Sequence, residues 1–107
     1  MTDVIIIGGG ASGMLAALTA AESGHSVLLL ERQSRVGRKL LATGNGRCNL
    51  TNYHAAPDRY HGEDGTFCAH ALREFDVGAT LQYFASLGLL TVSEDSGRVY
   101  QIGRAHV

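Results

Sequence analysis

The chain has 107 residues, of which nine are basic and ten acidic, so its formal net charge of −1 gives no general attraction to nucleic acid or anionic membranes. A chain of this length can form one small domain with a marginal core. Its apolar runs are far shorter than the ~20 residues that cross a bilayer. We therefore expect neither a nucleic-acid partner nor a membrane partner.

The cysteines and histidines predict a reduced protein without a bound metal. Cys48 and Cys68 do not form a CxxC pair, and no secretory leader pattern precedes the first apolar run, which favours a cytoplasmic location. We expect Cys48 to be a small buried residue, with a redox thiol as the alternative, and Cys68 to lie in a helix core. The histidines lack metal-ligand spacing, so no metal site is expected.

The first thirty residues predict a strand, a helix and a second strand. Residues 3–7 form an apolar, β-branched run that stops at a glycine cluster. Residues 11–23 are rich in alanine and predict a helix, which Gly24 would end in a left-handed conformation. Residues 26–30 are again apolar. We expect a βαβ unit with parallel strands buried on both faces, and with Met14, Leu15 and Leu18 on one side of the helix.

Weaker patterns follow a polar, irregular stretch. Two helices and two strands are expected, with Asp76 capping the second helix, Gly88 ending it and a turn over residues 94–97 joining the strands. The expected ranges are 66–75 and 77–87 for the helices, and 89–93 and 98–101 for the strands.

The glycine cluster has the spacing GxGxxG, at Gly8, Gly10 and Gly13. It follows a predicted strand and opens a predicted helix, which is the context of a dinucleotide-binding turn. Gly8 would permit the tight turn, Gly10 would let the backbone approach a pyrophosphate, and Gly13 would let the helix pack closely on the strand. The N–H groups at the helix start, which include those of Ala11 and Ser12, would bind the diphosphate.

An acidic residue stands where this fingerprint requires one. Glu31 ends the second predicted strand, 23 residues after Gly8 and close to the ~20 that the pattern expects. Its carboxylate would accept hydrogen bonds from the adenosine ribose hydroxyls and would repel a 2′-phosphate, which disfavours NADP at this site.

Five basic residues follow, with no acid among them: Arg32, Arg35, Arg38, Lys39 and Arg47. Because the stretch lacks aromatic residues and lies beside the phosphate turn, a role in balancing cofactor charge is favoured over nucleic-acid binding. Arg38 and Lys39 are the residues that we expect to face the cofactor.

The fold class that these patterns indicate is α/β: residues 1–101 would be the N-terminal βαβ portion of a Rossmann-like domain, incomplete because a doubly wound sheet needs further strands. Residues 102–107 are expected to be a non-native tail, since the sequence IGRAHV can be encoded by a string that resembles a sequencing adapter.

The stretch VGRKLLATGNGRCNLTN, at residues 36–52, closely resembles the signature of the BaiN/HI0933-like flavoproteins, an aminoacetone-oxidase-type family of NAD(P)/FAD-dependent oxidoreductases. The resemblance runs from the first strand to about Tyr100. It implies a protein several times longer, with FAD in an extended pose. By similarity Arg32 and Arg38 would line the adenosine end, and Gly44, Asn45 and Gly46 would pass near the flavin.

The sequence therefore predicts the FAD-binding segment of a flavin-dependent oxidoreductase, with an unknown small-molecule substrate and NAD(P)H as an electron donor. Two alternatives stay open. One is a segment of an NAD-binding dehydrogenase, which leaves the 36–52 signature unexplained. The other is a non-catalytic nucleotide-binding module.

Overall fold

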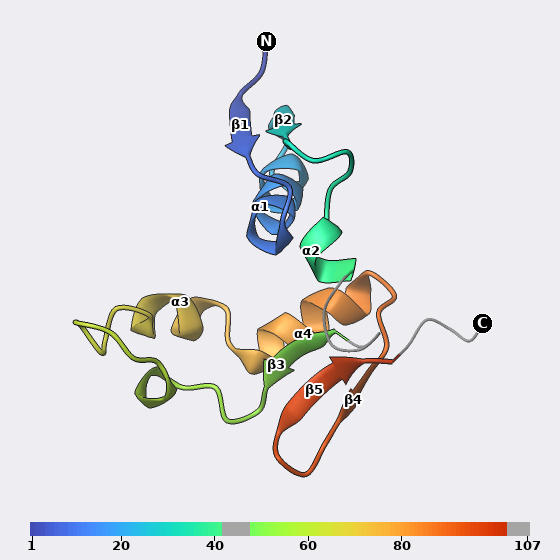
Figure 1. Ribbon diagram of the computed structural model, residues 1–107. Helices are drawn as coiled ribbons and strands as arrows, with labels where there is room; N and C mark the ends of the chain where they lie inside the picture. The colour runs from blue at the N-terminus through green and yellow to red at the C-terminus, as the bar shows by residue number, and fades with distance from the viewer. Residues whose placement is uncertain (42–47, 103–107) are drawn as a thin grey trace. The chain divides into compact units, whose positions relative to one another are not determined.

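Figure 1 shows the computed structural model of the chain, in which residues 1–41 and 48–102 are described. The chain divides into two compact units, Met1–Asn45 and Gly46–Val107. The first contains parallel strands and the second antiparallel strands.

The first unit is the predicted βαβ unit. Strand β1 (Val4–Ile7) leads into helix α1 (Ala11–Glu22), which returns the chain to strand β2 (Val27–Leu30). The strands are parallel and in register, with Val4 opposite Val27. A short helix, α2 (Arg38–Leu41), follows where the sequence suggested only a loop. The α/β fold class and the parallel pairing are confirmed.

The two strands are covered on one face only, so the prediction that both faces are buried is wrong for this chain. Side chains alternate between half-buried and exposed along each strand because successive residues point to opposite faces. Ile6 faces α1, near Gly13. No described element of this unit covers the other face, whose four apolar side chains are 45 to 86 % exposed: Ile5, Ile7, Leu28 and Leu30.

Helix α1 ends one residue earlier than predicted, at Glu22, with Ser23 as its C-cap. Gly24 then takes the left-handed conformation that the sequence indicated, with φ of +88°. Of the three apolar residues predicted on one side of the helix, Met14 and Leu15 are half-buried, whereas Leu18 is 44 % exposed.

The second unit contains a three-stranded antiparallel sheet in the order β3-β5-β4. The predicted hairpin forms from β4 (Thr91–Ser93) and β5 (Arg98–Gln101), and β3 (Asn49–Asn52) pairs with the other edge of β5. Among the described residues, Val99 on the central strand is the one fully buried hydrophobic side chain. The core of this unit is therefore small.

The described residues of the second unit also form two helices and a short 3-10 turn, Pro57–Arg59. Helix α4 (Val77–Ser86) begins as predicted at Asp76, whose side chain accepts a 2.8 Å hydrogen bond from the Ala79 N–H. Helix α3 (Ala69–Glu74) begins three residues later than predicted.

The late start of α3 has a local cause. The Asp64 carboxylate accepts hydrogen bonds from both the N–H and the hydroxyl of Thr66, which holds that stretch in a turn. Cys68, predicted to lie in a helix core, instead precedes α3 and is half-buried. In the described part of the chain, no helix has the length and apolarity needed to cross a membrane.

Candidate cofactor-binding site

The turn between β1 and α1 contains the first glycines of the GxGxxG pattern. Gly8 has a φ of +105°, a conformation that L side chains rarely adopt, and its N–H donates a 2.7 Å hydrogen bond to the Leu30 carbonyl. The chain thus turns sharply at the end of β1 while it stays joined to β2. Gly10 then caps α1 with extended backbone and no side-chain hydrogen bond.

The other two glycines of the GxGxxG pattern differ in what surrounds them. A Cβ atom at Gly13 would lie 1.9 Å from the Gly8 carbonyl oxygen, so only glycine lets α1 pack this closely on the turn. A Cβ atom at Gly10 would meet nothing within 4 Å. Gly13 is therefore required by the fold, whereas Gly10 leaves open space beside the backbone.

The start of α1 presents unpaired donors beside this open space. The N–H groups of Gly10, Ala11, Ser12 and Gly13 have no acceptor among the described residues. The first N–H groups of a helix lack intrahelical partners, and the helix dipole adds partial positive charge there. This end of α1 can accept an anion such as a diphosphate.

Glu31 lies at the end of β2 and connects two segments of backbone. One carboxylate oxygen, Oε1, accepts a 2.7 Å hydrogen bond from the Gly9 N–H, and Oε2 accepts a 2.7 Å bond from the Gln33 N–H. The side chain is half-buried. Because a carboxylate oxygen has two lone pairs, each oxygen can accept a further hydrogen bond, as contact with ribose hydroxyls would require.

The same contacts keep Glu31 ionised. The hydrogen bond from the Gln33 N–H, followed by that from Gly9, lowers the pKa of Glu31 below its ordinary value of 4.5. A depressed carboxyl pKa contributes stability that is present above the ordinary value and lost as the pH falls through the folded-state value. At neutral pH the residue is therefore a carboxylate, the form that accepts hydrogen bonds only.

Four of the five basic residues between positions 32 and 47 are described, and all four are exposed: Arg32, Arg35, Arg38 and Lys39. Arg47 lies outside the described residues. Arg38, on α2, donates a 2.6 Å hydrogen bond from Nη1 to the Gln33 side-chain oxygen. Arg32 adjoins Glu31, and Lys39 lies on the first turn of α2. The expected flavin-side residues Gly44, Asn45 and Gly46 lie outside the described residues.

The sequence reasoning missed a second set of contacts around the turn. The Gly37 N–H donates a 2.7 Å hydrogen bond to the Gly9 carbonyl, and Gly37 is buried with a φ of +70°. A Cβ atom at Gly9 would lie 2.7 Å from Val36 Cγ1. The available signals were the extra glycine in Gly8–Gly10 and the glycine at 37, because a buried glycine often marks close approach of backbone.

The last residues of the 36–52 signature form hydrogen bonds that hold strand β3 and the turn after it. Cys48 and Asn49 bind β5: the Cys48 carbonyl accepts a 3.0 Å bond from the Gln101 N–H, and the Asn49 side chain donates to the Val99 carbonyl. The Asn52 side chain accepts a 2.8 Å bond from the His54 N–H and turns the chain after β3. Cys48 is half-buried, not buried as expected, and neither cysteine is in a disulfide.

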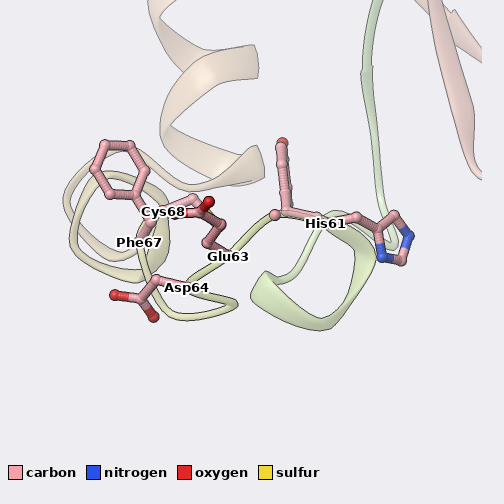
Figure 2. Close-up of a pocket in the computed structure, with 7 residues that line it drawn as sticks. His61, Glu63, Asp64, Phe67 and Cys68 are labelled. Atoms are coloured by element: carbon pink, nitrogen blue, oxygen red, sulfur yellow. The ribbon is translucent and has the colours of Figure 1, made fainter.

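A separate hollow of about 400 Å³ lies in the second unit, between residues 60 and 68 (Figure 2). The rings of His61 and Phe67 point in opposite directions, and Asp64 points outward. Within the described part of the chain, no group of three or more His, Cys, Asp or Glu side chains could hold a metal ion.

Comparison with known proteins identifies the family of this chain. The sequence profile described as "HI0933-like protein Rossmann domain" matches residues 2–106. The chain is 51 % identical over 102 residues to a 3-dehydro-bile acid delta(4,6)-reductase of Clostridium scindens. The aligned residues are 94 % of this chain and 25 % of that protein. It is 44 % identical over 73 residues to a ribosomal RNA dihydrouridine synthase of Escherichia coli, covering 68 % and 18 %.

A third similarity is more distant. A digeranylgeranylglycerophospholipid reductase of Methanoculleus marisnigri is 40 % identical over 63 residues, which cover 58 % of this chain and 16 % of that protein. The chain thus spans about a quarter or less of the length of these curated relatives. The profile match over nearly the whole chain, together with the βαβ unit and its glycine turn, shows that the chain belongs to the HI0933-like family and is part of its Rossmann domain.

Proposed function

We propose that this chain binds the ADP half of FAD, as the N-terminal segment of a longer flavin-dependent oxidoreductase. The observation that carries the proposal is the pairing of the Gly8–Gly13 turn with Glu31, whose carboxylate is hydrogen-bonded to that turn. The signature at residues 36–52, which resembles that of a flavoprotein family, favours FAD over NAD. The names of two relatives include the word reductase, which supports redox chemistry.

Two observations support a pyrophosphate at this turn: a Cβ atom at Gly10 would meet nothing within 4 Å, and the N–H groups at the start of α1 have no acceptor among the described residues. In this proposal the backbone of Gly10, Ala11, Ser12 and Gly13 binds the diphosphate, and Gly8 sets the turn. Glu31 accepts hydrogen bonds from the adenosine ribose hydroxyls. The remaining proposed contacts are with the adenosine end and the flavin: Arg32, Arg38, Lys39, Gly44, Asn45 and Gly46.

When bound, FAD supplies the electron transfer, and the protein supplies binding and orientation. The described residues hold the nucleotide end, so catalytic side chains and the substrate site belong to the rest of the longer protein. NAD(P)H is the proposed electron donor, the substrate is a small molecule, and the proposed location is the cytoplasm.

Replacement of Glu31 tests the site. We expect Glu31→Ala in the full-length protein to weaken FAD binding by about 1.5–3 kcal/mol, the range for a hydrogen bond to a charged group. The measurement is a titration of the apoprotein with FAD. Glu74→Ala, at an exposed glutamate of α3, is the matched control and should leave the affinity unchanged.

The preference between dinucleotides with and without a 2′-phosphate is a second measurement on Glu31→Ala. A 2′-phosphate on an adenine dinucleotide should be disfavoured by the native protein because of repulsion by Glu31, and less so by Glu31→Ala. If the native protein binds NAD in place of FAD, the segment is that of an NAD-binding dehydrogenase. Unchanged FAD affinity in Glu31→Ala would show that Glu31 binds only the protein backbone and not the ribose.

A further inference from the structure

Gly9, the residue between Gly8 and Gly10 of the GxGxxG pattern, contacts residues that lie more than twenty positions along the chain. The Gly9 N–H donates to Glu31 Oε1, and the Gly9 carbonyl accepts from the Gly37 N–H, each over 2.7 Å. Gly9 is itself buried. Both polar groups of this residue thus have a protein partner, and its N–H is not available to a ligand.

Two side chains pack against the Cα atom of Gly9. A Cβ atom built on Gly9 would lie 2.7 Å from Val36 Cγ1 and 3.1 Å from Leu29 Cδ2, so Val36 and Leu29 pack directly on its Cα. Contacts under 3.0 Å essentially never occur between real Cβ atoms and their neighbours. Any residue larger than glycine at this position has to displace Val36.

The corner at Val36–Gly37 packs against helix α1 as well as against the turn. Gly37 has a φ of +70°, and a Cβ atom there would lie 3.3 Å from Met14 Cε on α1. The corner therefore contacts both the phosphate turn and the helix that follows it. Val36 is nevertheless 46 % exposed, so its side chain contributes little to a hydrophobic core.

We propose that Val36 and Gly37 are positioning residues for the pyrophosphate turn: Gly37 holds the Gly9 carbonyl and Val36 packs on the Gly9 Cα, while Glu31 holds the Gly9 N–H. This inference rests on the proposed binding of FAD. A turn held in its binding conformation before the ligand arrives does not lose conformational freedom on binding, and this raises affinity. The corner itself need not touch the cofactor.

Four variants of the full-length protein test this role, with FAD titration and thermal melting as the two measurements. Val36→Ala should weaken FAD binding by about three- to tenfold, with a melting temperature close to that of the native protein. Val92→Ala is the matched control, since Val92 on β4 is also a partly exposed valine, at 43 %. It should leave the affinity for FAD unchanged.

The rescue experiment separates positioning from general stability. Gly9→Ala should weaken FAD by about tenfold or more, because the new methyl group displaces Val36, and residues in contact have coupling energies of that size. Adding Val36→Ala removes the 2.7 Å contact, so the double variant should bind FAD more tightly than Gly9→Ala alone. If Gly9→Ala does not fold, the comparison of Val36→Ala with Val92→Ala decides.

The inference is overturned if native protein binds FAD and Val36→Ala binds it equally well. A double variant no better than Gly9→Ala, or a loss of affinity in Val36→Ala that only follows a fall in melting temperature, overturns it too. Failure of the native protein to bind FAD contradicts the proposed function itself, so the two failures are distinguishable.

Discussion

Gly10→Val is expected to abolish FAD binding by the full-length protein without unfolding it. A Cβ atom at Gly10 meets no protein atom within 4 Å, and the backbone φ of −84° is ordinary for any residue, so the fold should tolerate the side chain. The valine would occupy the space beside the unpaired N–H groups of α1. Loss of two hydrogen bonds to a charged group costs about 3–6 kcal/mol, which is more than a hundredfold in affinity.

The control for this variant is Gly62→Val. Gly62 also has open space around its Cβ position, but it lies in the second unit, away from the glycine turn in the sequence. With FAD removed, both variants should melt at the temperature of the native apoprotein, and only Gly10→Val should be purified without FAD. Stoichiometric FAD in Gly10→Val would refute the assignment of the turn.

Residues 1–107 expressed alone should not form a stable FAD-binding protein. One hydrophobic side chain, Val99, is fully buried among the described residues, and the apolar face of β1 and β2 is exposed. The hydrophobic area that so short a chain buries roughly balances its conformational entropy, which leaves no net stability. No further described strand pairs with either edge of the two-stranded parallel sheet, and open sheet edges also favour aggregation.

Thermal melting of this segment with and without FAD provides the measurement. We expect an insoluble or molten species without a cooperative transition, whereas the full-length protein should melt cooperatively and at higher temperature with FAD. A cooperative transition of the segment that FAD shifts upward would instead make it an autonomous binding domain.

The first thirty residues could be predicted well because each signal there is local. The β-branched run of β1, the alanine-rich α1 and the glycine turn each depend on a few neighbouring residues, and their boundaries agree with the sequence within one or two positions. The single helix covers only one face of the strands. Periodicity does not report what lies over the other face, so the burial of Ile7 and Leu30 was predicted wrongly.

Strand β3 could not be predicted because its signal is not local. Its residues, Asn49–Asn52, include two asparagines, which are depleted in strands, and they pair with β5 across about fifty positions of sequence. The polar side chains are accommodated by hydrogen bonds such as that from Asn49 to the Val99 carbonyl. Long-range pairing outweighed intrinsic propensity here.

The candidate site could be predicted in part, because some of its residues belong to a local pattern and others meet only through long-range contacts. Spacing alone identified Gly8, Gly10, Gly13 and Glu31, since the fingerprint reflects one supersecondary unit. It did not show that the Glu31 carboxylate is already bound to the Gly9 N–H, or that Gly37 binds the Gly9 carbonyl. Such backbone contacts depend on the course of the chain after β2, which the GxGxxG spacing does not describe; Gly9 and Gly37 were the only hints in the sequence.

The most direct test of the central claim is the identity of the nucleotide that the full-length protein carries. The protein would be purified without added cofactor, its visible absorbance recorded, and the ligand released by denaturation and identified by chromatography and mass. Binding of FAD in a one-to-one ratio, lost in Gly10→Val and kept in Gly62→Val, is the predicted result. A colourless protein that does not take up added FAD, or one that binds only a nicotinamide dinucleotide, would contradict it.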